Sequence, residues 1–358
     1  MNSGLDDVVA AETVLSDVDG VRGRLVVRGV SLDALVESAR YEDAVGLMLD
    51  GFVKAEDWTA EIGRARAEVY PLLHYTGPGA DLPPTDALRA LLARLPDTTD
   101  ASTAAQLIAA HAVFTAGTLR LRQGLAPIAP EPTLPHAVDF LRMATGAMPK
   151  ERQAAALDRY LVTVIDHGLN ASTFVSRIVA STQAGLTSSV LAALGALKGP
   201  LHGGAPGPVL DMLDAIGEPT NAYPWLETAL ARGERLMGFG HRIYRVRDPR
   251  ADALKGAVRL LAASGAIDPA RLGLAEAVEQ AALDLLRRKK PDRPLDINVE
   301  FYTALLLEAL GFPREAFTCV FASGRVAGWI AHAREQALTG RLVRPKSVYV
   351  GPVPREAA

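Results

Sequence analysis

The chain has 358 residues and a formal net charge of −3, with 49% hydrophobic and 22% charged residues. The length predicts about two domains, and the balance of apolar and charged residues excludes a disordered chain. The small negative charge argues against a protein that binds nucleic acid regardless of sequence, because such proteins need a broad basic surface.

The predicted elements are mostly helices, because small and apolar residues recur at helical spacing along most of the chain. One strand is expected over residues 24–30, RLVVRGV, and a second, short strand in SVYV near the C-terminus. Helical segments are expected in DALRALLARL and AGLTSSVLAALGAL and from starting points near Ser31, Tyr41, Glu56, Thr103, Pro135, Arg152, Ala171, Pro208, Pro224, Ala251, Leu274, Glu300 and Glu315. Glycines and prolines between these segments end them. The sequence therefore predicts an all-α protein.

The sequence also predicts a soluble, cytoplasmic protein. Its first residues lack the basic and apolar regions of a secretory signal, and no stretch approaches the roughly 20 apolar residues of a membrane-spanning helix. The single cysteine, Cys319, excludes an intrachain disulfide, as expected in a reducing compartment. Because Cys319 lies in the apolar run AFTCVFA, we expect it to be a small buried residue.

Three of the seven histidines stand beside glycines or a break in the helical pattern, where a ligand can approach the backbone closely. They are His167 in VIDHGLNASTF, His202 in KGPLHGGAPG and His241 in MGFGHRIYRVRDPR. Zinc binding is the competing interpretation, but their wide separation follows no local metal-ligand pattern and no cysteine is near, so we expect no metal. The remaining histidines are expected to be core or surface residues: His74, His111, His136 and His332.

Several charged residues stand in unusual surroundings. Arg325 lies in the glycine-containing apolar segment ASGRVAGWIAH, where burial requires an anionic partner, either an internal carboxylate or a ligand. Arg250 follows in DPR and Arg344 in VRPKS. Glu300 enters an apolar helix near its N-terminus, either as an acid favoured by the helix dipole or as a carboxylate base in a dry site. Burial would raise its pKa, whereas the helix end would lower it.

Seven segments together resemble the citrate synthase family, in order and separation, over almost the whole chain. They are GLDDVVAAETVLSDVDGVRGRLVVRG, DHGLNASTF, LHGGA, GFGHRIYRVRDPRA, NVEFY, GRVAGWIAH and RPKSVYVGP. The resemblance implies a large helical domain (residues 1–202 and 303–358) with an inserted smaller helical domain (residues 203–302). It also implies a homodimer, because the chain lacks the long N-terminal extension of the hexameric form.

The resemblance also implies a role for each site residue. His202, oriented by Ser172, would polarise the thioester carbonyl of acetyl-CoA, and His241 would face the keto oxygen of oxaloacetate. Glu300 falls at the position of the aspartate that takes the methyl proton. The residues implied to hold the dicarboxylate are His167, Arg250, Arg325 and, from the other subunit, Arg344. Those implied to contact CoA are Leu236, Gly238, Phe239, Gly240 and Arg242.

The sequence departs from the family pattern at three positions. Glu300 replaces aspartate, Pro206 stands where the family has asparagine, and Gly168 stands where it has glutamate. The change at Glu300 keeps the carboxylate but adds a methylene, and small misplacement of a base can cost about 100-fold in rate.

The predicted function is a transferase of the tricarboxylic acid cycle. It condenses acetyl-CoA with oxaloacetate and water to citrate and CoA, through an enolate and with no cofactor beyond the thioester. A 2-methylcitrate synthase using propionyl-CoA is the nearest alternative, because one methylene in a pocket discriminates by only about 1–3 kcal/mol. A non-catalytic ligand-binding paralogue and an α-helical interaction scaffold are further alternatives. We expect no nucleic-acid or membrane partner.

Overall fold

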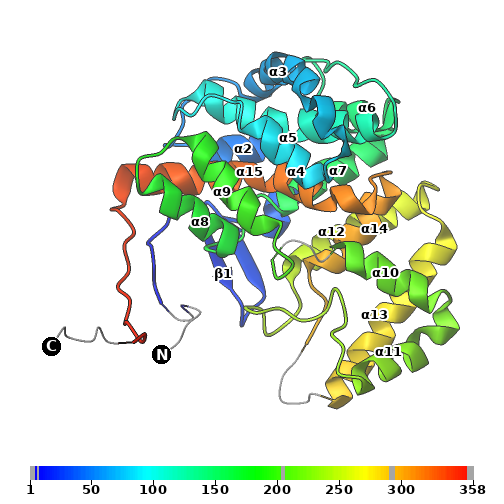
Figure 1. Cartoon of the computed structure of the whole chain (residues 1–358). Coiled ribbons are helices and arrows are strands. Elements are labelled where there is room, and N and C mark those ends of the chain that lie inside the picture. Colours follow the sequence, from blue (N-terminus) through cyan, green and yellow to red (C-terminus); the bar gives the residue numbers. More distant parts are fainter. Residues whose placement is uncertain (1–4, 6–7, 203–205, 290–294, 353–358) are drawn as a thin grey trace.

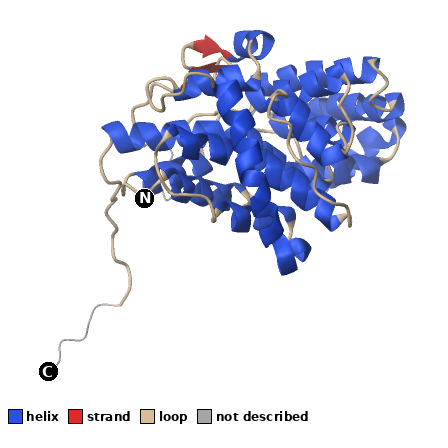
Figure 2. Ribbon diagram, turned by 90° about the horizontal axis from the view of Figure 1, so that it is seen from above, coloured by secondary structure: helices blue, strands red, loops and turns tan. Residues whose placement is uncertain are grey.

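The structure, a computed structural model, describes residue 5 and residues 8–202, 206–289 and 295–352. Within these residues helices dominate, and the paired strands are confined to one small sheet (Figure 2). The predicted all-α fold is confirmed. No helix in these ranges combines the length and the apolar character needed to cross a membrane.

The first half of the chain supplies most of the helical body in Figure 1. Its helices are α1 (Leu32–Ser38), α2 (Tyr41–Leu49), α3 (Trp58–Val69), α4 (Pro84–Leu92), α5 (Ala101–Arg122), α6 (His136–Thr145), α7 (Glu151–Thr163), α8 (Ala171–Ala180) and α9 (Leu186–Leu197), with the 3-10 helix η1 (Tyr70–Asp81). Side-chain oxygens of Asp57, Asp100 and Asn170 cap the first turns of α3, α5 and α8, which explains where these helices begin.

The second half of the chain supplies the remaining helices. They are α10 (Pro206–Ile216), α11 (Ala222–Ala231), α12 (Pro249–Ala263), α13 (Pro269–Lys289), α14 (Val299–Ala309) and α15 (Phe317–Thr339), with the 3-10 helices η2 (Pro219–Asn221) and η3 (Arg314–Ala316). The helix expected from Leu274 begins earlier, at Pro269. Its start carries the Asp-Pro signal of a capped helix, since Asp268 accepts a hydrogen bond from the N–H of Ala270 at 2.9 Å.

Two long helices, α5 and α15, form the centre of the core and are buried along most of their lengths. Both carry apolar or small residues on every side, so neighbours must cover them from all directions. α15 crosses the body and packs against α2, α5, α7, α8 and α9 (Figure 1). Cys319, near the start of α15, is buried, as predicted. Of the four histidines expected in structural roles, His111, His136 and His332 are buried and His74 is exposed.

Helices α10, α11 and α13 lie together at one side of the molecule, beyond α12 and α14 (Figure 1). α12 packs against both α7 and α14, and α10 also packs against α14, so these contacts join the side group to the body. The division into residues 1–202 with 303–358 and residues 203–302 stays a prediction, and its boundary at residue 203 lies outside the described residues.

The small sheet differs from the sequence prediction. The single strand expected over residues 24–30 is two strands, β2 (Arg24–Val27) and β3 (Val30–Ser31), because Arg28 and Gly29 both adopt positive φ and turn the chain. An unpredicted strand, β1 (Ser16–Asp19), pairs antiparallel with β2 in the order β1-β2-β3. β1 lacks the alternation of apolar residues that marks a strand, so its sequence carried little signal.

The second predicted strand, SVYV, is wrong. Residues 340–352 leave α15 as an extended chain that runs away from the helical body (Figures 1 and 2), and residues 347–350 pair with no strand in the described part of the chain. A strand needs a neighbour to satisfy its backbone groups, and apolar alternation alone does not supply one.

Two glycines of α15 allow an unusually close approach to residues 161–166. A Cβ at Gly324 would lie 2.5 Å from Val164 Cγ2, and a Cβ at Gly328 would lie 2.2 Å from the carbonyl oxygen of Ile165. Both distances are too short for any side chain. These glycines therefore bring α15 against the segment that leads into His167.

We predict that Gly328→Ala destabilises the protein by about 1–3 kcal/mol, because the added methyl pushes α15 away from Ile165. Urea unfolding measures the change. Gly195→Ala on α9 is the matched control, since a Cβ there meets nothing within 4 Å and alanine favours a helix. Equal stability of Gly328→Ala and the wild type would show that this close contact is not needed.

Candidate active site

Most of the predicted site residues come from helix starts and loops, and Arg325 comes from the interior of α15. Ser172, Arg250 and Glu300 stand two residues after the N-caps Asn170, Asp248 and Asn298, in the first turns of α8, α12 and α14. Each cap accepts a backbone N–H of its own first turn, which fixes the helix start. Three functional side chains are therefore presented from three capped helix N-termini.

His202 is held through one ring nitrogen. Its Nε2 lies 2.8 Å from Ser172 Oγ and 3.3 Å from the backbone N–H of Ser172, and Trp329 Nε1 donates to the same Oγ at 3.1 Å. A backbone N–H can only donate, so we assign Nε2 as the acceptor and place the proton of the neutral ring on Nδ1. Burial and then the charge of Arg325 lower the pKa of His202 to about 4. The ring is neutral at pH 7 and keeps Nδ1–H as a donor.

His241 is fixed in the opposite tautomer. Its Nδ1 accepts the backbone N–H groups of Ile243 at 3.0 Å and Tyr244 at 3.1 Å, so the proton of the neutral ring lies on Nε2. Burial and then the charge of Arg250 lower the pKa of His241 to about 4. Arg250 Nη2 lies 3.4 Å from His241 Nε2. Two donors side by side suit one oxygen acceptor of a ligand.

His167 completes a group of three aromatic rings. Its Nε2 lies 3.1 Å from the hydroxyl of Tyr244, and its ring meets that of His241 edge-on with centroids 5.4 Å apart. Burial, followed by the charge of Arg250, lowers the pKa of His167 well below its ordinary value. His167 is therefore neutral and held against Tyr244 and His241.

Arg250 is buried and paired with the carboxylate just before it. Its Nε lies 3.0 Å from Asp248 Oδ1 and its Nη2 lies 2.7 Å from Asp248 Oδ2, a fork-shaped contact between two buried groups. The same Asp248 Oδ1 caps α12 through the N–H of Arg250. Asp248 thus compensates the buried charge and aims it at His241.

Arg325 is the least compensated cation of the site. It is 1% exposed, and its Nε donates to the carbonyl of Val164, at the C-terminal end of α7, at 2.5 Å. Its Nη2 is buried and has no hydrogen-bond partner among the described residues. Burial lowers the pKa of Arg325 to about 10, against the opposing pull of Asp166. The guanidinium remains charged at pH 7 and has an unused donor for an anionic ligand.

Glu300 carries the perturbed carboxyl of the site. Burial raises its pKa to about 7, while Arg250 lowers it and Asp248 raises it further. Its Oε2 is buried and has no hydrogen-bond partner within the described ranges. Of the two opposing effects expected from the sequence, desolvation outweighs the helix end. A carboxyl that exchanges its proton near pH 7 is suited to general acid–base chemistry.

The segment implied to contact CoA lies beside Glu300. The backbone of Phe239 bridges to Ile297, Asn298 donates to the carbonyl of Gly240 at 2.9 Å, and the rings of Phe239 and Phe301 lie 5.3 Å apart. Gly238 has φ +83°, and a Cβ there would lie 2.8 Å from Phe301 Cβ. The Leu236–Gly240 segment is thereby fixed to the first turn of α14. Leu236 is buried and Arg242 is exposed.

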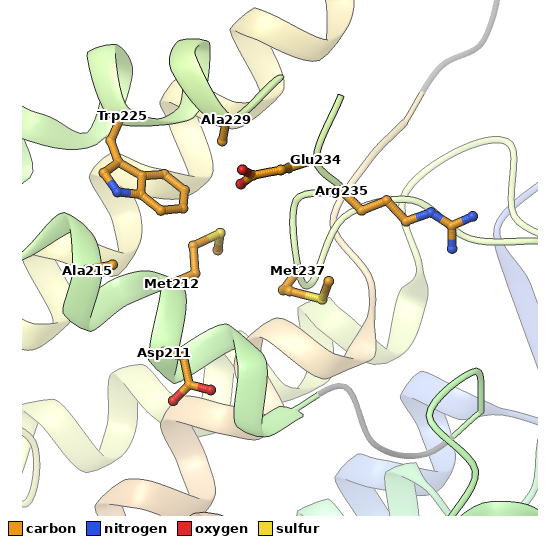
Figure 3. A pocket seen from close by; sticks show the side chains of 8 residues that line it. All are labelled: Asp211, Met212, Ala215, Trp225, Ala229, Glu234, Arg235 and Met237. Carbon is orange, nitrogen blue, oxygen red and sulfur yellow. The ribbon is translucent and has the colours of Figure 1, made fainter. Parts of the chain in front are cut away.

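A separate pocket of about 440 Å³ is lined by residues of α10, of α11 and of the chain that follows α11 up to Met237. In Figure 3 the side chains of Trp225, Met212 and Met237 face the hollow, while Arg235 points away from it. Met237 directly precedes Gly238, so this apolar pocket adjoins the segment predicted to contact CoA.

One predicted residue does not join the others within the chain. Arg344 is exposed and lies on the extended segment after α15. The remaining predicted residues of the reacting centre gather in one place, with Ser172 against His202, Arg250 against His241, and the charges of Arg250 and Arg325 acting on Glu300. In the described part of the chain, no group of three or more His, Cys, Asp or Glu side chains is placed to hold a metal ion.

Sequence reasoning missed the residues that orient the predicted ones. Tyr244 contacts His167, Asp248 pairs with Arg250, Trp329 donates to Ser172, and Asn298 ties Gly240 to α14. The Asp-Pro-Arg and Asn-Val-Glu strings carried a readable signal, because an Asx N-cap stands two residues before each functional side chain. Nothing in the sequence marked Tyr244 or Trp329.

Comparisons with known proteins agree on one family. The family model of the citrate synthase C-terminal domain matches residues 4–346. The chain is 34% identical to the citrate synthase of Haloferax volcanii, over 98% of this chain and 96% of that one. It is also 34% identical to the 2-methylcitrate synthase of Mycobacterium tuberculosis, over 98% of this chain and 91% of that one.

A solved structure extends this agreement to three dimensions. A ternary complex of carboxymethyl coenzyme A and oxaloacetate with the citrate synthase of Thermoplasma acidophilum has a TM-score of 0.87 and 28% identity, and it covers 100% of this chain and 98% of that one. The protein is therefore an enzyme of the acyltransferase class. The chain belongs to the citrate synthase family.

We predict that Asp248→Asn destabilises the protein by about 3 kcal/mol, because it leaves the buried Arg250 charge unpaired. Asparagine still caps the helix, so the loss reports the charge. Urea unfolding measures it, and Asp252→Asn on the same helix is the control, since Asp252 is exposed and its partner Arg247 keeps Glu279 and Asp296 as partners. If both variants were equally stable, Asp248 would not be compensating Arg250.

Proposed function

We propose that the protein is a citrate synthase, which condenses acetyl-CoA with oxaloacetate and hydrolyses the product to citrate and CoA. One observation carries the proposal. Two neutral imidazoles, His202 and His241, are fixed in opposite tautomers, and the charges of Arg325 and Arg250 that act on them also act on Glu300, a carboxyl with a pKa of about 7. This combination of donors and base is what carbon–carbon bond formation from a thioester requires.

The first step is removal of a proton from the methyl group of acetyl-CoA. Ionised Glu300 takes the proton, and Nδ1–H of His202 donates to the thioester oxygen as negative charge develops there. A protonated His202 would also donate, but its low pKa keeps it neutral, and Ser172 holds the ring in the donating tautomer. The enolate thus forms without a metal or other cofactor.

The second step is attack of the enolate carbon on the keto carbon of oxaloacetate. Nε2–H of His241 donates to the keto oxygen and stabilises the alkoxide that forms. Arg250, Arg325 and His167 bind the carboxylates, with arginine favoured because its fork matches a carboxylate and its charge persists when buried. The unused Nη2 donor of Arg325 supports this assignment.

The third step is attack of water on the thioester of citryl-CoA, which releases CoA and citrate. The Leu236–Gly240 segment and Arg242 bind CoA, since this segment is fixed beside Glu300. Closure of the proposed small domain over the large one excludes water until the carbon–carbon bond has formed. We place the enzyme in the cytoplasm and in the tricarboxylic acid cycle.

A 2-methylcitrate synthase is the second candidate, because a protein with that activity in its name is 34% identical to this chain, as is the citrate synthase of Haloferax volcanii. Propionyl-CoA differs from acetyl-CoA by one methylene, and its reaction needs the same donors and base. We propose acetyl-CoA as the preferred substrate and propionyl-CoA as a slower one.

The test is the rate of thioester loss with oxaloacetate and either acetyl-CoA or propionyl-CoA. We expect a higher kcat/KM for acetyl-CoA and a rate that rises with pH through about 7, as Glu300 ionises. Glu300→Gln should lower kcat about 100- to 10,000-fold. A strong preference for propionyl-CoA would assign the second candidate, and no turnover of either thioester would refute both.

We propose further that the enzyme is a homodimer in which Arg344 enters the site of the partner subunit. Arg344 stands on an extended segment that also exposes Leu342, Val348, Tyr349 and Val350. An extended chain with several exposed apolar side chains suits burial against a second subunit. It would bring one further cation to the dicarboxylate.

Mixing two inactive variants tests this sharing. Arg344→Ala and His202→Ala each inactivate their own homodimer, but a mixed dimer has one site with both residues intact. We expect activity to reappear on mixing, up to about a quarter of wild type if subunits exchange at random. Exchange is verified independently by mass spectrometry of the mixture. If mass spectrometry shows that subunits have exchanged but the mixture stays inactive, Arg344 and His202 of the same chain belong to one site.

A further inference from the structure

Four buried polar atoms with no hydrogen-bond partner among the described residues lie on three helices that meet at the site. They are Tyr160 Oη on α7, Glu300 Oε2 and Thr303 Oγ1 on α14, and Arg325 Nη2 on α15. A buried polar group without a partner is costly, so such groups in one region indicate a working contact. Arg325 has an expected ligand, whereas Tyr160 has no role in the site so far.

Tyr160 is fully buried near the end of α7, and its hydroxyl faces the charges of the site. Glu300 is the charge that acts on it most strongly, followed by Arg325 and Arg250. The hydroxyl of Thr303, one turn along α14 from Glu300, is also a neighbour, but no hydrogen bond of good geometry joins the two hydroxyls. The hydroxyl of Tyr160 thus lacks an acceptor, and the nearby carboxylate oxygen Oε2 of Glu300 lacks a donor.

The other groups that face Glu300 are already engaged. From α12, Arg250 is paired in a fork with Asp248. From α15, Arg325 donates its Nε to Val164, and its unpaired Nη2 is the donor assigned above to a ligand carboxylate. The neutral donors that remain are the hydroxyls of Tyr160 on α7 and Thr303 on α14. Thr303 shares the helix of Glu300, so Tyr160 is the donor that a different helix supplies.

We propose that Tyr160 is a positioning residue that donates its phenolic hydrogen to the Oε2 of Glu300 when Glu300 is ionised. The inference deepens the proposed function, because it concerns the base of that reaction. The contact fixes a side chain that is one methylene longer than aspartate and directs its other oxygen toward the substrate. Catalytic hydrogen bonds are often loose before substrate binds, which agrees with the unpaired atoms.

A hydrogen bond to the ionised carboxylate favours that form, so Tyr160 opposes the effect of burial on the pKa of Glu300. Tyr160→Phe removes the hydroxyl and keeps the ring. We expect the acidic limb of the kcat/KM profile to move to higher pH by about one unit, while the KM for oxaloacetate stays within about twofold.

A second readout does not depend on activity. The pKa of Glu300 in the folded protein is above its ordinary value of 4.5, so the folded state binds the proton more tightly than the unfolded chain does. Stability therefore falls as pH rises from about 4.5 to about 7 and then levels off. The difference in Tm between wild type and Glu300→Gln isolates this effect. In the Tyr160→Phe background the same difference should level off about one pH unit higher.

Tyr41→Phe is the matched control. Tyr41 is equally buried and donates to the carbonyl of Ser323 at 2.7 Å, so its variant loses a buried hydrogen bond and should lower Tm without moving either pH profile. A second control compares Glu300→Asp with the double variant Glu300→Asp, Tyr160→Phe. The aspartate carboxylate is one methylene farther from Tyr160, so adding Tyr160→Phe should leave both pH profiles unchanged.

The Tm difference between Glu300 and Glu300→Gln proteins is measured against pH with Tyr160 present and in the Tyr160→Phe background. If the two curves superimpose, the proposal is overturned. A shift of equal size in the Glu300→Asp background would also overturn it, because that shift could not come from contact with Oε2. A wild-type protein that turns over neither thioester but shows the Tyr160-dependent shift in Tm would refute the proposed function and support the contact.

Discussion

The architecture of the site depends on one buried charge inside an apolar helix. α15 cannot satisfy the guanidinium of Arg325 from its own residues, so the carbonyl of Val164 at the end of α7 accepts its Nε. That contact requires the chain at residues 161–166 to lie directly on α15, and Gly324 and Gly328 supply the room. The same approach fixes the start of the loop that carries His167.

This loop is held from its other side by a polar network. Asp166 lies 3.2 Å from His332 on α15 and accepts a hydrogen bond from Ser16 on β1. His332 in turn lies 3.0 Å from Arg177, which pairs with Glu335 at 2.5 Å. Every member is buried or partly buried, so the network is stable only when its partners are all in place. The small sheet thereby contributes to the site although it lies outside the helical body.

Burial and charge together select the protonation states that the proposed chemistry needs. The arginines stabilise neutral His167, His202 and His241, and burial acts in the same direction. Asp248 neutralises Arg250 within the protein, whereas no ion pair joins Arg325 to a carboxylate in the described residues. The surplus positive charge matches a dicarboxylate ligand. Burial without a full salt bridge also leaves Glu300 able to exchange a proton near neutral pH.

The sequence by itself determined the helical fold and predicted most residues of the proposed site. Helical periodicity located most helix starts to within a few residues, and glycine-flanked histidines with Arg250, Arg325 and Glu300 marked the site. Capping explains this success, because Asn170, Asp248 and Asn298 fix helix starts through contacts two or three residues away. Such signals are local, so a single sequence carries them.

Only the tertiary structure decided how these groups are oriented and charged. The tautomer of His202 depends on Ser172, thirty residues earlier in the chain. The pKa of Glu300 depends on how deeply α14 is packed, and Tyr160 reaches the site only because α7 lies against α14. The SVYV segment shows the same limit, since its pattern suits a strand but no strand among the described residues pairs with it. Burial and long-range pairing arise from packing of distant segments, which local sequence pattern does not encode.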